Sequence, residues 1–195
     1  EGKGKGVWGL RDINEGRRNF GEINGTYVGQ IFKDRKELAS IGIHKPLMGG
    51  IWGDGEEGAS SIVLSGGYED DIDDLNYILY TGQGGQDKPG GKQVADQEYV
   101  RGNKALVLSS KYDLPVRVTR GHQIPNGPDK GYRYDGLYYV NKFERIKGQS
   151  GHYICRFHLS SEKEIEKLET ELKPTLKSDY KRTERASATV NRLKR

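Results

Sequence analysis

Short segments with strand character, each bounded by glycine or other turn residues, recur along most of this 195-residue chain. The clearest is His152–Leu159, in which Tyr153, Cys155, Phe157 and Leu159 take alternate positions, as on one face of a strand. Glycine accounts for 28 residues, about twice its usual share. This pattern predicts an α+β, mainly β domain. The other candidate strands are Ser60–Ser65, Asn76–Thr81, Pro115–Arg120 and Leu137–Ile146.

Two helices and one long loop are expected among these strands. The sequence KDRKELASI at 33–41 predicts a short helix that ends at Gly42. Residues 94–109 predict a second helix, which Gly102 weakens. The segment 47–59 has the composition of a glycine-rich loop.

The chain divides into three parts by composition. Residues 1–25 show no sustained period and predict an irregular N-terminal lead-in, and residues 26–160 form the main domain. From Ser161, an N-cap residue with Glu164 completing a capping box, the sequence becomes strongly charged and helical in pattern. We expect 161–195 to be a charged helical linker toward a C-terminal domain outside this sequence. The alternative is a solvated terminal helix.

Several chemistries fail on residue type or spacing. A single Cys155 excludes an internal disulfide framework or a cysteine-rich zinc site, and its place in a strand pattern favours a core residue over a catalytic thiol. The four histidines have no metal-ligand spacing, and the acidic run 69–74 lacks that of a calcium loop, so no metal is expected. A nucleotide-binding P-loop ending at Lys92 would need glycine where Gln86 stands.

Charge and hydropathy limit the partners. No stretch approaches the roughly 18 apolar residues of a membrane span, so no membrane partner is expected. The first residues do not resemble a signal peptide, and together with the single cysteine this leads us to expect an intracellular setting. The net charge of +4 comes mostly from 162–195, so the main domain is nearly neutral. If it binds DNA, a local site must supply much of the affinity.

Four sequence blocks together point to one family. They are GIHKP at 42–46, GGYEDD at 66–71, YTGQGG at 80–85 and Tyr134-Asp135-Gly136 within GYRYDGLYYV. In this order they resemble the SRA (SET- and RING-associated) domain, also called the YDG domain, over roughly 26–160. The resemblance implies an SRA/PUA-like, partly open, saddle-shaped β-barrel with flanking helices and a pocket on its concave side.

The resemblance also implies a ligand, double-stranded DNA that carries a modified cytosine. In this family the base is flipped out of the duplex and held between two tyrosines, which match Tyr68 and Tyr80. Flipping costs a few kcal/mol, and stacking on aromatic rings returns about 1–3 kcal/mol per base. The alternative is that both tyrosines are ordinary strand aromatics.

The base-reading position of the family matches Asp71. A carboxylate accepts a hydrogen bond from the N4 amine of cytosine, whereas thymine presents an acceptor there. Backbone groups near Thr81, Gly66 and Gly67 are expected to serve the other edge atoms. Gln83 stands where some relatives have a small residue beside the C5 substituent, so 5-hydroxymethylcytosine is a candidate ligand beside 5-methylcytosine. The neighbouring acidic residues Asp70, Asp73 and Asp74 are expected to be turn or solvent residues.

Two loops of the family enter the DNA grooves. One matches the segment around Met48, and the other matches Lys88–Gln93. Gly91, Lys92 and Gln93 stand where the eukaryotic maintenance-methylation reader has an Asn-Lys-Arg finger, so a preference for hemimethylated sites is not carried over. The candidate phosphate contacts, each with plain surface charge as the alternative, are Lys45, Lys88, Arg117, Arg120 and Arg133.

SRA domains occur in ubiquitin-ligase readers, plant histone methyltransferases and microbial restriction enzymes. The tail 185–195 resembles the connector to an HNH nuclease, so we expect the recognition domain of a modification-dependent SRA–HNH endonuclease. We expect the full-length protein to be a homodimer, because cutting both strands commonly takes two catalytic modules. We expect this chain to need no cofactor and not to cleave DNA. A divalent metal is expected only for the nuclease domain. The alternatives are a nuclear epigenetic reader of methylated CpG and a glycosylase that uses Asp71 as its base.

Overall fold

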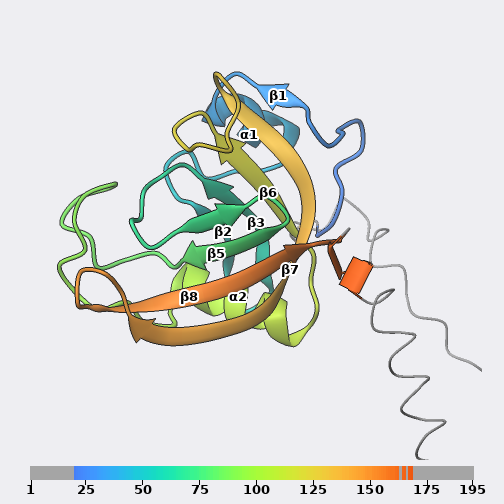
Figure 1. The fold of residues 1–195 in the computed structure, drawn as a ribbon. Coiled ribbons are helices and arrows are strands. Elements are labelled where there is room, and N and C mark those ends of the chain that lie inside the picture. The colour runs from blue at the N-terminus through green and yellow to red at the C-terminus, as the bar shows by residue number, and fades with distance from the viewer. Residues whose placement is uncertain (1–19, 163, 166, 169–195) are drawn as a thin grey trace, which may run out of the picture. The chain divides into compact units, whose positions relative to one another are not determined.

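The structure is a computed structural model that describes residues 20–162, 164–165 and 167–168. Two helices and eight strands follow one another along these residues (Figure 1). They are β1 (Ile31–Phe32), α1 (Arg35–Ile41), β2 (Ile51–Asp54), β3 (Gly58–Leu64), β4 (Ile72–Asp74), β5 (Tyr77–Thr81), α2 (Arg101–Lys111), β6 (Val116–Gly121), β7 (Tyr132–Lys147) and β8 (Tyr153–Ser161).

All eight strands belong to one mixed sheet that does not close into a barrel. Seven of them lie in the order β2-β3-β6-β7-β8-β5-β4, and β1 pairs with β7 beside this path. The prediction of a mainly β, partly open fold is therefore confirmed, and its strands form one continuous sheet. The curvature comes largely from β7, whose 16 residues bend visibly in Figure 1. Its first half pairs with β6 and its second half with β8.

One pair of neighbouring strands, β3 and β6, is parallel, with Ser61 opposite Arg117 and Leu64 opposite Arg120. A parallel pair cannot be joined by a tight turn and needs a long crossover connection. Here the crossover runs from residue 65 to 115 and contains β4, β5 and α2. The helix α2 returns the chain across the sheet and packs against β2, β3 and β7.

The main core lies between the sheet and α2. Its members are fully or almost fully buried, and they include Ala105 and Leu106 from α2 and Phe157 and Leu159 from β8. Cys155 is completely buried in the same cluster, so its prediction as a core residue is confirmed. A smaller cluster around Phe32, Leu38, Ile43 and Tyr134 secures α1 to β7.

The five predicted strands and both predicted helices are present. Asp34 caps α1, because its side chain accepts hydrogen bonds from the backbone N–H groups of Lys36 and Glu37, and Gly42 ends the helix at φ 88°. The prediction that 47–59 is a loop is wrong in part, since β2 and the start of β3 lie within it. Trp52 and Gly53 sit at a register irregularity of β2, which obscures its strand pattern.

The ends of the chain lie mostly outside the described residues. Of the predicted lead-in 1–25, only residues 20–25 are described. Ser161 ends β8, and residues 162, 164, 165, 167 and 168 are helical, whereas the predicted linker beyond them falls outside the description. Contacts divide the chain into two units between Ser161 and Glu162. Within the described residues, neither helix has the length and apolar character that crossing a membrane requires.

Candidate nucleic-acid interface

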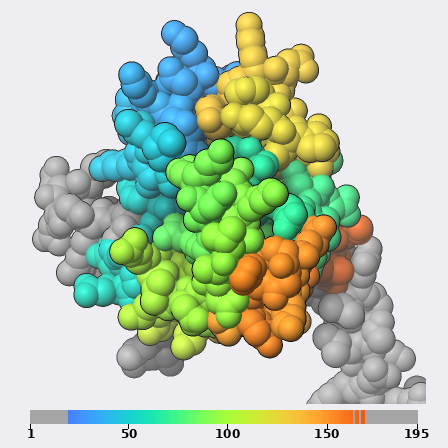
Figure 2. All heavy atoms as spheres, turned by 90° about the vertical axis from the view of Figure 1, so that its left-hand side faces the viewer, coloured from blue at the N-terminus to red at the C-terminus, as the bar shows by residue number. Residues whose placement is uncertain are grey.

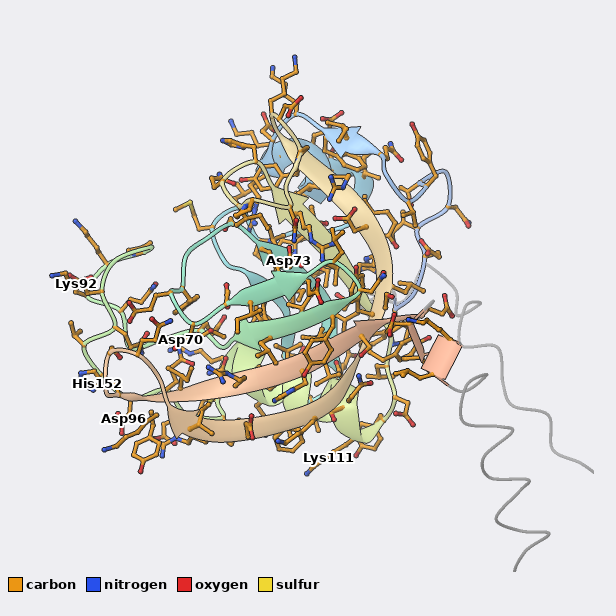
Figure 3. All side chains as sticks on the ribbon, viewed as in Figure 1. Asp70, Asp73, Lys92, Asp96, Lys111 and His152 are labelled. Carbon is orange, nitrogen blue, oxygen red and sulfur yellow. The ribbon has the colours of Figure 1, made fainter. Side chains whose placement is uncertain are left out.

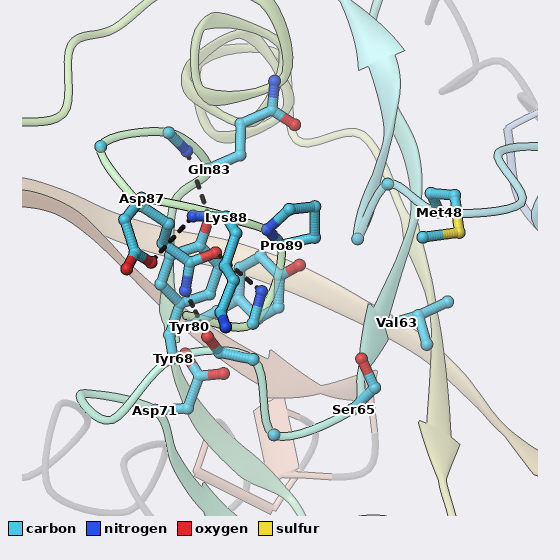
Figure 4. Close-up of a pocket in the computed structure, with 18 residues that line it drawn as sticks. Met48, Val63, Ser65, Tyr68, Asp71, Tyr80, Gln83, Asp87, Lys88 and Pro89 are labelled. Carbon is cyan, nitrogen blue, oxygen red and sulfur yellow. Dashed lines mark hydrogen bonds between the residues drawn. The ribbon is translucent and has the colours of Figure 1, made fainter. Parts of the chain in front are cut away.

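A cavity of about 640 Å³ opens between β5 and the loops that flank it (Figure 4). Its lining residues come from the stretches 48–50, 63–71 and 80–90. Figure 2 shows the face on which it opens, where the glycine-rich segment after β5, in green, stands out at the centre. The cavity brings together six of the seven residues predicted for the base pocket: Gly66, Gly67, Tyr68, Asp71, Tyr80 and Gln83. Met48 of the predicted groove loop and Lys88, a predicted phosphate contact, also line it.

Asp71 lies at the wall of this cavity, just before β4. Its Oδ1 accepts a hydrogen bond of 2.7 Å from the backbone N–H of Thr81. Thr81 itself does not line the cavity but fixes the carboxylate. The pKa of Asp71 is raised to about 6, chiefly by burial, against the lowering effect of its hydrogen bonds with Thr81; the neighbouring charges of Asp70 and Asp73 also act to raise it. The cavity thus holds an acceptor that ionises near neutral pH.

Two tyrosines line the same cavity. Tyr80 on β5 is only 4% exposed, and burial raises the pKa of its hydroxyl well above the usual value. Its hydroxyl lies against Gly50, where an added Cβ would come within 2.6 Å of it. Tyr68 is partly exposed, and its hydroxyl accepts a hydrogen bond of 3.1 Å from the backbone N–H of Gly84. The Tyr68 ring is thus held by its hydroxyl end, and both rings line the cavity.

Gln83 lines the cavity, but its side chain turns toward α2 (Figure 4). A Cβ added at Gly102 would lie 2.8 Å from its Oε1, so Gly102 makes room for this amide. Asn103 fixes the backbone of Gln83 through two hydrogen bonds, one accepted from its N–H at 2.8 Å and one donated to its carbonyl at 3.0 Å. This packing also explains why α2 carries a glycine in its first turn.

The segment around Met48 is held from beneath by two polar side chains. The guanidinium of Arg35 donates to the carbonyls of Pro46, at 3.0 Å, and of Gly49. The ring of His44 lies 2.9 Å from the same Gly49 carbonyl and 2.8 Å from the Ser61 hydroxyl. Burial lowers the pKa of His44 to about 3, helped by the nearby Arg35 charge, so the ring is neutral. Met48 itself is 83% exposed.

The glycine-rich segment after β5 is locked by its own side chains. Gln93 donates from Nε2 to the carbonyls of Gly84, at 3.1 Å, and Ala95, at 2.7 Å. The amide of Gln93 is therefore turned onto its own loop, and the predicted contact with a base edge or phosphate would require these bonds to break. Gly91, Lys92 and Gln93 do not line the cavity. Lys92 is exposed and points away from the sheet at the outer end of the loop (Figure 3).

Two of the five predicted phosphate contacts are contradicted by burial. Arg120 is 1% exposed and forms ion pairs with Asp73 at 2.7 Å and Asp135 at 2.8 Å. Burial alone would lower the pKa of Arg120, but these hydrogen bonds raise it. Arg117 is 0% exposed, donates to the carbonyls of Ile43 and Gly21, and stacks on Trp52. Both guanidiniums hold the domain together and do not face solvent.

The acidic residues beside Asp71 are corrected in the same way. Asp73 is the partner of Arg120, and Asp70 is 6% exposed and accepts a hydrogen bond of 3.0 Å from the backbone N–H of Gln149. The prediction of a turn or solvent residue is wrong for Asp73, which lies in β4 and pairs with a buried arginine. Asp70 does lie in a turn, but its carboxylate is buried and not exposed to solvent. Asp74 is exposed, as predicted.

The remaining three cations differ in exposure. Lys45 and Lys88 are exposed, and the Lys45 ammonium lies 5.7 Å from the centre of the Trp52 ring. Arg133 is partly buried and bonded to Asp135 at 2.6 Å. Asp135 of the Tyr134-Asp135-Gly136 motif thus joins Arg120 and Arg133, so this motif has a structural role. Within the described ranges, no three side chains of the metal-ligating types are grouped for an ion.

Sequence reasoning missed the residues that support the pocket from outside it. His44 lies in the GIHKP block and Arg35 in the predicted helix 33–41, but neither residue type nor spacing indicates their support of the Met48 segment. Nothing in the spacing of Gln86, Gln97 or Asn103 marks them either. Gln97 is 1% exposed, donates to the Gly82 carbonyl at 2.7 Å and accepts from the Cys155 N–H at 3.0 Å. Isolated polar residues in glycine-rich stretches are a signal for such supports, but a weak one.

Comparison with known proteins places these features in a family. The sequence pattern described as the SAD/SRA domain matches residues 19–164. The E3 ubiquitin-protein ligase UHRF1 of Rattus norvegicus is 35% identical over 194 residues, covering 88% of this chain and 24% of that protein. The H3 lysine-9 specific histone methyltransferase SUVH4 of Arabidopsis thaliana is 41% identical, covering 73% of this chain and 25% of that protein. The chain spans about a quarter of these relatives.

Two solved structures are similar as well. The modification-dependent TagI restriction endonuclease matches with a TM-score of 0.71 at 41% identity, covering 74% of this chain and 53% of that chain. The SUVH5 SRA domain bound to fully hydroxymethylated CG DNA matches with a TM-score of 0.63 at 40% identity, covering 72% of this chain and 92% of that chain.

Proposed function

Since the chain belongs to the SAD/SRA domain family, we propose that it binds double-stranded DNA containing a modified cytosine, which is flipped into the cavity between Tyr68 and Tyr80. Relatives of this fold were solved with methylated and hydroxymethylated DNA. The observation that carries the proposal is the cavity itself, in which two aromatic rings and one oriented, partly buried carboxylate converge. Aromatic rings bind any base, whereas the carboxylate selects the N4 amine of cytosine.

In the proposed complex the C5 substituent contacts the cavity wall. Burying a single methyl group is worth about 0.8 kcal/mol, so strong selectivity requires a wall that fits it closely. Because the amide of Gln83 turns toward α2, the space beside the base is set by the Gln83 backbone rather than by its side chain. This arrangement favours acceptance of both methyl and hydroxymethyl groups.

For the whole protein we propose a modification-dependent endonuclease in which this domain targets an HNH nuclease. The similarity to the TagI restriction endonuclease supports this role, and so does the basic segment 185–195 of the sequence. The second candidate is an epigenetic reader, which the similarity to UHRF1 and SUVH4 favours. In either case we propose that the domain itself is not catalytic.

The test is equilibrium binding to one duplex that carries cytosine, 5-methylcytosine or 5-hydroxymethylcytosine on one or both strands. Salt is held near the physiological concentration, because contacts with phosphate depend strongly on it. We expect tighter binding to either modified base than to cytosine. A fluorescent base analogue placed at the target position reports whether the base leaves the stack. Equal binding to all duplexes would reject the proposal.

A further inference from the structure

Gln86 spans two segments that border the cavity. Its Nε2 donates hydrogen bonds to the Gly67 carbonyl at 2.5 Å and to the Gly91 carbonyl at 3.1 Å. Its Oε1 accepts from the Gly90 N–H at 3.3 Å. One partly buried amide therefore joins the chain before Tyr68 to the glycine-rich loop after β5.

The two segments carry different parts of the interface. Gly67 directly precedes Tyr68 and lies four residues before Asp71, which together form the base-reading wall. Gly90 and Gly91 lie between Lys88 and Lys92, the exposed cations of the loop. The two segments also meet where Gly84 donates to the Tyr68 hydroxyl, but that bond lies at the base of the loop and not at its end.

The outer part of the loop depends on few contacts. Its backbone closes on itself through Gly91 N–H to Lys88 O, at 2.8 Å, and Asp87 N–H to Lys92 O, at 3.0 Å. Lys88 and Lys92 therefore belong to one small turn, and the Gln86 side chain is hydrogen-bonded to that turn. The stem below the turn is held separately, by Gln93 and by the Gly85 carbonyl. Among the hydrogen bonds described, the Gln86 amide is the one that ties the turn to the chain before Tyr68.

We propose that Gln86 is a positioning residue, which holds Lys88 and Lys92 in register with the wall formed by Tyr68 and Asp71. The inference rests on the proposed function and deepens it: a base that enters the cavity and phosphates that meet the two lysines are engaged together because one side chain fixes their spacing. A loop that is ordered before binding does not lose conformational entropy on binding, and this raises affinity for the specific complex.

The test compares three variants of the chain. Gln86→Ala removes the amide, and Gln86→Arg restores donors for the two carbonyls. Gln30→Ala is the matched control, because Gln30 accepts a hydrogen bond only from the Tyr27 N–H among the side-chain bonds described and lies outside the cavity. Affinity is measured for modified and unmodified copies of one duplex, and hydrogen exchange is followed at the Gly90 and Gly91 amides.

We expect Gln86→Ala to reduce the ratio of modified to unmodified affinity about 5- to 30-fold, the range for loss of one or two hydrogen bonds. Faster dissociation should account for the change, and exchange at Gly90 should accelerate. Gln86→Arg should keep the ratio within about threefold of the wild type, and Gln30→Ala should leave it unchanged. The ratio cancels any uniform effect of the added arginine charge.

The outcomes separate this inference from the function on which it rests. If the wild-type chain binds modified and unmodified duplexes equally, the proposed function itself fails. If the wild type prefers the modified duplex and Gln86→Ala keeps the full preference, only the positioning role is overturned, whatever the exchange rate at Gly90. A loss of preference in Gln86→Ala that Gln86→Arg restores supports the role.

Discussion

Asp71 and Thr81 are joined by a hydrogen bond of 2.7 Å, in which the Thr81 backbone N–H holds one oxygen of the Asp71 carboxylate. Thr81 follows Tyr80 on β5, so one strand both supplies an aromatic side chain of the cavity and orients the carboxylate at its wall. The ring and the carboxylate are thereby fixed relative to each other by the backbone of a single strand.

Replacing Asp71 with asparagine separates its role in recognition from its effect on stability. Asparagine keeps an oxygen for the Thr81 N–H but presents an NH₂ group to the base, which suits the O4 of thymine and opposes the N4 amine of cytosine. We expect Asp71→Asn to lose its preference for 5-methylcytosine over thymine in otherwise identical duplexes. Retention of the wild-type preference would show that Asp71 does not read the base.

The same substitution should stabilise the fold at pH 7.5. The pKa of Asp71 is raised to about 6 from 3.8, so the folded state disfavours its ionised form. The free-energy cost of holding an ionised Asp71 in the folded state is fully present above pH 6 and disappears as the pH falls toward 3.8. The wild-type protein therefore gains stability from this group as the pH is lowered. Since one pKa unit equals about 1.36 kcal/mol, removing the carboxylate gains at most about 3 kcal/mol. Urea unfolding at pH 7.5 and pH 4.5 measures the difference, which should shrink at the lower pH.

Base selectivity should also depend on pH. Above pH 6 the ionised Asp71 only accepts hydrogen bonds, and it repels the O4 of thymine. Below pH 6 the protonated carboxyl can also donate, which lets it pair with thymine as well as with cytosine. We expect the preference for 5-methylcytosine over thymine to decline between pH 7 and pH 5. Competition binding across this range tests it, with Asp71→Asn as the pH-independent control; a flat profile in the wild type would contradict the assignment.

Gly50→Ala should damage the aromatic wall. A Cβ at this position would lie 2.6 Å from the Tyr80 hydroxyl, so the buried ring must shift. Gly49→Ala is the matched control, because its Cβ would have ordinary contacts of 3.5 Å or more. We expect Gly50→Ala to weaken binding of modified DNA about tenfold, in keeping with partial loss of stacking, while Gly49→Ala stays within about twofold. Fluorescence anisotropy with the modified duplex and with its unmodified copy measures the change in affinity.

Replacing Arg120 should lower the stability of the fold. Because Arg120 is buried between Asp73 and Asp135, Arg120→Met leaves two carboxylates without their cation and should destabilise the fold by about 3–5 kcal/mol. Chemical denaturation measures this loss. If Arg120→Met were as stable as the wild type but bound DNA more weakly, Arg120 would be a phosphate contact after all.

Lys92→Ala should leave the stability of the fold unchanged and weaken binding to modified and unmodified DNA alike. Loss of one phosphate contact reduces the slope of log affinity against log salt by about 1. Lys111→Ala provides the control, since Lys111 ends α2 and does not line the cavity (Figure 3). An effect of Lys92→Ala on the modified duplex alone would instead indicate a base contact.

The sequence predicts much of the fold because its strands carry their own periodicity. His152–Leu159 has alternating core residues, and helix 33–41 has a terminating glycine, so both are visible locally. The strand β2 is hidden by Trp52 and Gly53 at its irregular register, and β4 is only three residues long. Elements whose pairing is set by distant partners leave no such local pattern.

The candidate site divides in the same way. Tyr68, Asp71 and Tyr80 stand in a recognisable block order, and the structure brings them to one cavity. Arg120 was indistinguishable from a surface cation, because the residue that pairs with it, Asp73, lies 47 positions away. Charge along a chain shows neither burial nor pairing. The supports Gln86 and Gln97 act on backbone carbonyls, which no side-chain pattern can mark.

The crossover between the parallel strands β3 and β6 carries contacts for recognition and contacts for folding on one stretch of chain. Tyr68, Asp71, Tyr80 and the lysine-bearing loop lie on it, and so does Asp73, the partner of the buried Arg120 just after it. Loops accept change more readily than the sheet they connect. Ligand preference is therefore open to change in the loop after β5, whereas a change at residues 70–73 also alters contacts that hold the sheet together.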